Sequence, residues 1–156
     1  MSFKLARAKG QSIPRVKERA LVAGSAFKIG ALLLINGANE YAECGADPVS
    51  IAAVAQSGAG ASTEIGNRTG KEEFPPGFKQ GILVQDEVEF RSRYVGALPG
   101  AVGGSYGVIK DADGFWKVDF NETVATRLKY IRSYATSPEN LPEVGSIFLA
   151  ANVQVS

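Results

Sequence analysis

The sequence predicts a mainly β protein: a small barrel-like or sandwich-like single domain with glycine-rich loops and an extended N-terminal arm. Two observations lead to this prediction. Short segments rich in β-branched and aromatic residues recur along the chain, and turn signals separate them. The 156 residues include 18 Gly and 7 Pro, the residues that most often interrupt regular structure. A chain of this length buries roughly 68–70% of its unfolded surface, so it can form a substantial core.

Residues 1–20 differ from the rest of the chain in charge and composition. Six basic side chains and one acidic side chain give them a net charge of +5, and since the whole chain carries +1, residues 21–156 carry −4. The segment has few apolar residues and no helical or strand period, so it cannot offset its ordering entropy alone. We predict an extended arm over 1–20 and one β-rich domain over 21–156. The candidate partner-binding residues of the arm are Lys4, Arg7, Lys9, Arg15, Lys17 and Arg19.

The composition of this arm leaves two interpretations open. Localised positive charge speeds association with an acidic surface, either of a protein or of a nucleic acid. A solvated, frayed terminus has the same composition.

The first predicted element of the domain is a hairpin. The apolar residues 31–35 lead into Asn36-Gly37, a dipeptide that accepts positive φ in tight turns, and residues 41–44 resume an alternating pattern. Residues 51–55 follow an Asp47-Pro48 pair, which is typical of a helix start. Their apolar run is too short for periodicity to separate a helix from a buried strand.

The remaining elements are predicted strands separated by turns. Glycines and prolines are dense over 57–81, which predicts a long loop. A second hairpin is expected to join residues 106–109 to 115–119 through Asp113-Gly114. Over 126–132 β-forming residues favour a strand, although Val124, Leu128 and Ile131 also fit one helical face. The other predicted strands are 82–84, 88–91 and, closing the chain, 146–150.

The residue types present exclude several classes of enzyme. The chain has no His, which removes Ser-His-Asp and Cys-His nucleophile activation and the usual zinc-hydrolase ligands. The single cysteine, Cys44, cannot form an intrachain disulfide or a Cys-rich metal site. The residues Asp111-Ala112-Asp113-Gly114 resemble the start of a calcium loop, but glycine stands fourth instead of sixth, and a turn explains them better. We expect no enzymatic activity, no catalytic residue, no cofactor and no bound metal.

Membrane and nucleic-acid functions find little support in the sequence. The longest apolar run, residues 31–35, is far shorter than the roughly 20 residues that cross a bilayer. No apolar segment follows the basic N-terminus, so we expect no secretory signal. Residues 90–94 interleave aromatic and basic side chains, as RNA-binding strands do. A strand with inward aromatic and outward basic side chains explains them equally well.

Several of these segments together resemble one protein family. Residues 26–34 read AFKIGALLL and residues 47–55 read DPVSIAAVA. They are similar to the opening of tailed-phage capsid decoration (cement) proteins, in which a Lys-x-Gly-x-Leu/Val strand precedes a turn and a Pro-x-x-Ile-x-Gly/Ala-Val-Ala strand. The later segments VEFR (88–91), YGV (106–108) and WKVD (116–119) resemble later strands of that family. The likeness covers most of residues 24–150 and favours a strand for residues 51–55.

The resemblance implies a structural, non-enzymatic virion protein. Its members are β-rich, assemble as homotrimers on the outer surface of the capsid, bind the major capsid protein and stabilise the shell, with an N-terminal arm that becomes ordered there. We therefore expect the basic arm to bind the capsid, and we expect nucleic acid not to be a partner. The alternatives are another β-barrel virion component, such as a tail-tube or head-completion protein, or a nucleic-acid-binding module with a basic arm.

Overall fold

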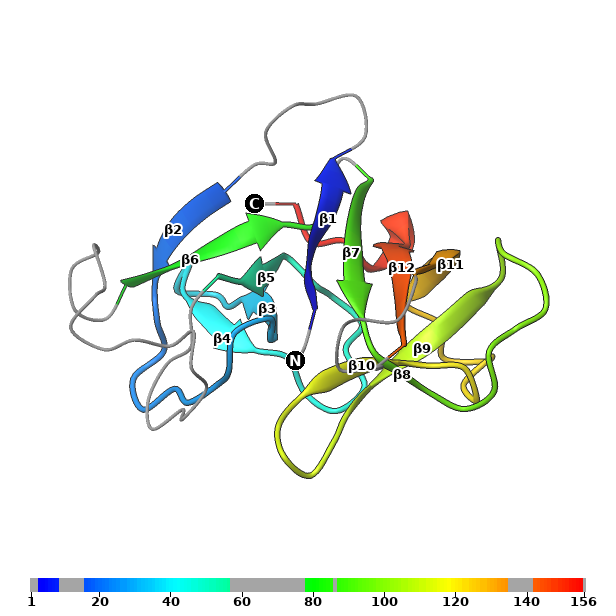
Figure 1. Ribbon diagram of the computed structural model, residues 1–156. Coiled ribbons are helices and arrows are strands. Elements are labelled where there is room, and N and C mark those ends of the chain that lie inside the picture. The colour runs from blue at the N-terminus through cyan, green and yellow to red at the C-terminus, as the bar shows by residue number, and fades with distance from the viewer. Residues whose placement is uncertain (1–2, 9–15, 57–77, 86, 135–141, 156) are drawn as a thin grey trace.

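The protein folds into two β-sheets that pack around a shared core (Figure 1). The computed structural model describes residues 3–8, 16–56, 78–85, 87–134 and 142–155. The seven-stranded sheet has the order β1 (Lys4–Ala8), β7 (Val88–Ser92), β12 (Glu143–Phe148), β11 (Leu128–Tyr134), β9 (Ser105–Lys110), β10 (Trp116–Asp119) and β8 (Tyr94–Val95). The five-stranded sheet has the order β2 (Val16–Ala20), β6 (Phe78–Leu83), β5 (Ala53–Ala55), β3 (Leu32–Ile35) and β4 (Tyr41–Glu43).

This arrangement confirms the predicted mainly β, sandwich-like fold. The five-stranded sheet is curved, so its two end strands, β2 and β4, approach each other. Leu21, which follows β2, forms a bridge with Tyr41 in β4. The amide of Val22 also donates to the Tyr41 carbonyl oxygen at 3.1 Å. A closed barrel needs a continuous ladder of backbone hydrogen bonds between its first and last strands, and a single bridge does not provide one. This sheet is therefore not a closed barrel.

Both predicted hairpins are present, and side-chain oxygens shape their turns. Between β3 and β4, the Asn36 side-chain oxygen accepts from the amides of Ala38 and Glu40, at 3.0 and 2.9 Å. The residue with positive φ is Asn39 (65°), two positions after the expected Gly37. Between β9 and β10, Asp111 accepts from the amides of Asp113 and Phe115 at 2.9 Å each, and Gly114 has φ 88°. The Asp-rich segment is therefore a turn, as predicted.

The other predicted strands also form, with shifted ends. Residues 53–55 form β5, which settles the choice between helix and strand, and β11 begins at Leu128. The last strand, β12, is earlier than predicted, and a short 3₁₀ helix, η1 (Ala150–Asn152), follows it. The segments predicted at 82–84 and 88–91 lie in or next to β6 and β7.

The predicted loop over 57–81 lies outside the described residues except for its last four, and these belong to β6. Gly81 pairs with Lys17 on one side and Ala55 on the other. A Cβ at Gly81 would lie 2.6 Å from the Ala53 Cβ and 3.0 Å from the Tyr41 hydroxyl oxygen. This glycine is thus needed for close packing inside a sheet, and a loop glycine was the wrong interpretation.

The N-terminal segment is extended, as predicted, but it is not separate from the domain. β1 pairs antiparallel with β7, and β2 pairs antiparallel with β6, so residue 20 is not a domain boundary. Phe3 is 1% exposed, and its ring centroid lies 5.4 Å from that of Phe148. The expectation of a free arm is wrong because strand pairing with β6 and β7 supplies backbone hydrogen bonds that the sequence of the segment does not reveal.

The C-terminal segment fastens the two sheets to each other. After β12 the chain leaves the seven-stranded sheet and runs toward β6 (Figure 1). Val153 forms a bridge with Ile51, next to β5, and the amide of Ile51 donates to the Asn152 carbonyl oxygen at 2.8 Å. The side-chain amide of Gln154 forms the same pair of hydrogen bonds with Ile35 that a neighbouring strand would form. It accepts from the Ile35 amide at 2.9 Å and donates to the Ile35 carbonyl oxygen at 2.8 Å.

The substitution Gln154→Glu tests this attachment. A carboxylate keeps the acceptor but loses the donor, and it places negative charge against the Ile35 carbonyl oxygen. We expect the free energy of unfolding to fall by about 1–3 kcal/mol, the usual cost of leaving a partly buried polar group unpaired. Urea unfolding followed by tryptophan fluorescence gives the value. Gln56→Glu, at an exposed position with the same change of charge, is the control, and equal effects of the two substitutions contradict the assignment.

Candidate interaction site

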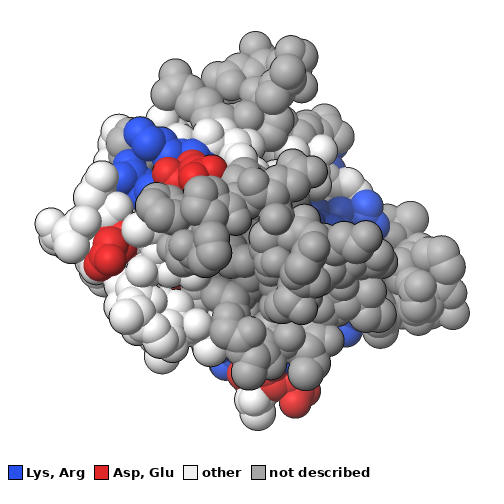
Figure 2. Space-filling view, turned by 90° about the vertical axis from the view of Figure 1, so that its left-hand side faces the viewer, with Lys and Arg blue, Asp and Glu red and all other residues white. Residues whose placement is uncertain are grey.

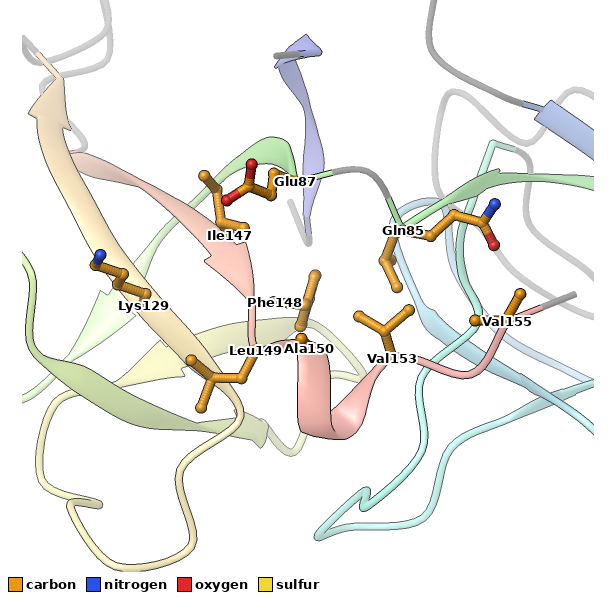
Figure 3. Close-up of a pocket in the computed structure, with 10 residues that line it drawn as sticks. Gln85, Glu87, Lys129, Ile147, Phe148, Leu149, Ala150, Val153 and Val155 are labelled. Atoms are coloured by element: carbon orange, nitrogen blue, oxygen red, sulfur yellow. The ribbon is translucent and has the colours of Figure 1, made fainter. Parts of the chain in front are cut away.

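An apolar pocket of about 360 Å³ lies where the two sheets meet. It is formed between the β6–β7 connection and the segment that follows β12 (Figure 3). The size lies within the range of ordinary ligand pockets, and mostly apolar walls with a few polar groups are typical of them. Its apolar lining residues are Val84, Ile147, Phe148, Leu149, Ala150, Val153 and Val155.

Three polar residues complete the lining: Gln85, Glu87 and Lys129. Figure 3 places Gln85 on the side of Val155 and Lys129 on the opposite side, near Leu149. The Gln85 Oε1 atom is buried and has no hydrogen-bond partner among the described residues. Lys129 is exposed, and no acidic partner for it lies within ion-pair distance in the described part of the chain. The site thus combines apolar walls, a buried amide oxygen and two side chains of opposite charge, Glu87 and Lys129.

The backbone of the β6–β7 connection is unusual at this pocket. Glu87 has φ 55°, in the left-handed region that residues with a Cβ rarely adopt. The connection carries the chain from β6, an inner strand of one sheet, to β7, an inner strand of the other, within a few residues, so the chain turns tightly here.

A second polar feature is a charge network on the seven-stranded sheet. Two of its carboxylates are buried: Glu89 in β7 is 2% exposed, and Glu143 in β12 is 5% exposed. Glu143 Oε1 lies 2.9 Å from Arg91 Nε and 3.3 Å from Lys4 Nζ. The network therefore ties the N-terminal strand β1 to β7 and β12. Buried carboxylates are tolerated when they are paired in this way.

The other half of the network joins β7 to β11. Glu89 Oε2 lies 3.2 Å from Arg132 Nε and also accepts a hydrogen bond from the Tyr134 hydroxyl. The Arg91 guanidinium stacks over the Tyr134 ring, 4.4 Å from its centroid. The Glu89 and Tyr134 side chains meet over Gly145, a residue of the strand β12 that lies between β7 and β11. A Cβ at Gly145 would overlap the Glu89 carboxylate and lie 2.9 Å from Tyr134 Cε2. Only a glycine at position 145 leaves room for the contacts of Glu89 with Tyr134 and Arg132.

The six basic residues of the predicted arm are not gathered into one site. Lys4 forms an ion pair with Glu143. Arg19 is buried, contacts the Asn39 side chain and lies over the Tyr41 ring. Lys17 is exposed on β2, and its carbonyl oxygen accepts from the Tyr41 hydroxyl at 2.9 Å. Arg7 lies in β1, but its side chain is outside the described part of the structure, as are Lys9 and Arg15.

The charges on the side of the molecule facing the viewer in Figure 2 are mixed. Basic and acidic side chains lie next to one another over the described part of this face. An extended patch of positive charge, which carries nucleic-acid binding, is not seen among them.

Apolar side chains are exposed on loops at the β8 end of the seven-stranded sheet. Leu98 and Val102 lie between β8 and β9, and Val124 lies between β10 and β11. The two loops belong to the same end of the molecule, because Asn121 packs against Gly96 and the Gly103 amide donates to the Tyr130 carbonyl oxygen at 2.8 Å.

The only cysteine of the sequence, Cys44, is buried and has an unreactive thiol. Cys44 is 6% exposed, and burial raises the pKa of its thiol to about 12, with the neighbouring Glu43 charge adding to the shift. A thiol with so high a pKa is a poor nucleophile at neutral pH. The described residues contain no group of three or more His, Cys, Asp or Glu side chains that could hold a metal. Among them there is also no helix long and apolar enough to span a membrane.

Sequence reasoning did not find the pocket or the charge network. The pocket joins residues from 84 to 155, so no local pattern marks it. The sequence predicts a strand over 88–91 but not the burial of Glu89, which depends on Gly145 and Tyr134, far along the chain. No protein family model and no curated protein matches this sequence.

The substitution Gly145→Ala tests the structural role of the charge network. The added methyl group would push Glu89 away from Arg132 and Tyr134, so we expect a loss of about 1–3 kcal/mol in the free energy of unfolding, as for other overpacked sites. Gly100→Ala serves as the matched control, because no atom lies within 4 Å of the position of its Cβ. Thermal and urea unfolding of both variants supply the comparison, and a Gly145→Ala protein as stable as the control would refute the close packing.

Proposed function

We propose that the protein is a structural component of a phage virion, which binds the major capsid protein on the outer surface of the capsid as a decoration protein and stabilises the shell. One observation carries the proposal. The segments that resemble decoration proteins, at residues 26–34, 47–55, 88–91, 106–108 and 116–119, overlap with β3, β5, β7, β9 and β10. The resemblance therefore involves strands of both sheets, together with residues 26–31 and 47–52, which precede β3 and β5.

The surface of the domain supports a role in assembly. The seven-stranded sheet ends in β1 on one side and β8 on the other, and neither end strand has a second neighbour among the described strands. Open strand edges are commonly covered by another chain, and closed symmetric assembly is the usual solution. The exposed side chains of Leu98, Val102 and Val124 on the loops beside β8 add apolar surface for such contacts. A homotrimer fits this surface.

The N-terminal segment has a revised role in this proposal. An extended partner segment adds to a sheet edge through main-chain hydrogen bonds, and β1 offers such an edge with basic residues along it. The positive charge of residues 1–20 speeds encounter with an acidic shell, since exposed ion pairs themselves contribute only about 0–1 kcal/mol each. The described basic residues of β1 and β2 act from within the folded domain and not as a free arm.

Co-sedimentation with empty, expanded tailed-phage capsids tests the function. We expect the purified full-length protein to sediment with the capsids and to saturate at a fixed ratio. The double variant Lys9→Glu/Lys17→Glu reverses basic charges of the N-terminal segment while sparing Lys4 and Arg19, which have structural contacts. It should bind more slowly, with a smaller effect of salt on the rate.

The control is Arg93→Glu, which reverses a charge next to β8 at the opposite end of the same sheet. Deleting residues 1–20 is not a useful test, because it removes two strands and the buried Phe3. Failure of the unmodified protein to bind capsids overturns the proposed function. Equal binding rates of the double variant and the Arg93→Glu control overturn the role of the N-terminal charges.

A further inference from the structure

A row of basic side chains crosses the outer face of the seven-stranded sheet, over the neighbouring strands β1, β7, β12 and β11 (Figure 1). Lys4 of β1 lies opposite Arg91 of β7. Gly145 of β12 lies opposite both Arg91 and Arg132 of β11. Paired residues on neighbouring strands direct their side chains to the same face. The other face is the core, where Phe90 is buried, so the three cations share the outside of the sheet.

Buried carboxylates hold the two arginines of this row in place. Arg91 donates from Nε to Glu143 Oε1 at 2.9 Å, and its guanidinium lies over the Tyr134 ring. Arg132 Nε is buried and lies 3.2 Å from Glu89 Oε2, an ion pair without hydrogen-bond geometry. Both guanidinium groups therefore have restricted positions before any partner arrives.

The outer edge of each guanidinium is open. The Arg91 side chain is 30% exposed and the Arg132 side chain 40% exposed, whereas the carboxylates beneath them are 7% and 3% exposed. In the described part of the chain, the Nη1 and Nη2 atoms of both arginines make no hydrogen bond or ion pair, and none of these atoms is buried. Such an edge presents two N–H groups that bind an oxyanion in a bidentate manner. Because the groups are already fixed, binding costs little side-chain entropy.

The charge balance of the row favours carboxylates over phosphates as ligands. Each guanidinium already shares its charge with a buried carboxylate, so the surface has little net charge with which to attract a polyanion. A singly charged carboxylate gains instead from the fixed bidentate geometry. The backbones of β7 and β11 are two strand spacings apart, roughly 9–10 Å. Alternate side chains of an extended segment lie about 7 Å apart on one side, and glutamate is long enough to cover the difference.

We propose that Arg91 and Arg132 form a binding site for two carboxylates of an acidic, extended segment of a partner protein. Each guanidinium binds one carboxylate through its Nη1 and Nη2 atoms and stays attached to its own buried carboxylate. Lys4, whose side chain is 41% exposed beside Glu143, extends the site by one cation. In capsid binding, which rests on the proposed function, the acidic segment belongs to the outer surface of the major capsid protein.

A peptide titration of the full-length protein tests the site without capsids. The probe is a capped peptide of alternating threonine and glutamate, and the control peptide has glutamine in place of glutamate. In proton–nitrogen NMR correlation spectra, we expect the glutamate peptide to shift the Nε–Hε signals of Arg91 and Arg132, and the glutamine peptide to leave them unchanged. Equal shifts with the two peptides, or no shift of either arginine, overturn the site.

The double variant Arg91→Lys/Arg132→Lys separates the site from the fold. Lysine keeps a positive charge beside the buried carboxylates but loses the planar fork. We expect the glutamate peptide to bind about tenfold more weakly, the effect of losing one charge-assisted hydrogen bond. Arg93→Lys, next to β8 at the opposite end of the sheet, is the matched control. Thermal unfolding verifies the fold, and Arg132→Lys alone gives the same comparison if the double variant unfolds. Binding as tight as that of the control contradicts the proposal.

Other anions decide the class of partner. Inorganic phosphate and a single-stranded RNA homopolymer are titrated in the same way. We expect both to bind more weakly than the glutamate peptide. Tighter binding of either one, falling steeply with salt, overturns the choice of carboxylates.

Capsid binding by the unmodified protein is measured separately. If the glutamate peptide binds at the arginines but capsids are not bound, the proposed decoration function fails and the carboxylate site stands. If capsids are decorated but the peptide does not shift the arginine signals, the site fails and the decoration function stands.

Discussion

The structure depends on holding two sheets together at one junction. The chain passes this junction twice among the described residues: once between β6 and β7, where Glu87 takes a left-handed conformation, and once after β12. The second passage is fixed by the bridge of Val153 to Ile51 and by both hydrogen bonds of the Gln154 amide. The apolar pocket lies between the two passages. The interaction that joins the sheets thus also shapes this apolar pocket.

Local sequence patterns predict most of the strands, but they do not predict which strands pair with one another. The Asp113-Gly114 turn is encoded within a few residues, and so is the alternation that marks β7 and β10. The N-terminal strands were missed because their order comes from β6 and β7, whose paired residues lie between 58 and 87 positions away along the chain. Gly81 was assigned to a loop for a similar reason, since its neighbours Ala53 and Tyr41 become visible only in the folded chain.

The two polar features of the molecule have different consequences. The network of Glu89 and Glu143 is closed: its carboxylates are buried and paired, and it attaches β1 to the sheet. The pocket and the loop carrying Val124 both lie at the surface of the domain. The first feature therefore holds β1 in the sheet, and recognition through apolar contacts is expected at the second. A structural protein that assembles on a shell needs both properties, a rigid body and surfaces that remain unpaired until assembly.

A cryo-EM reconstruction of empty, expanded phage capsids incubated with the protein tests the central claim most directly. The account predicts added density on the outer surface, distributed over the whole shell, in which copies are grouped in threes and fit the two-sheet fold. Density confined to the portal vertex or the tail would contradict decoration and favour a head-completion or tail-tube component. A shell identical to the untreated capsid would contradict any role at its surface.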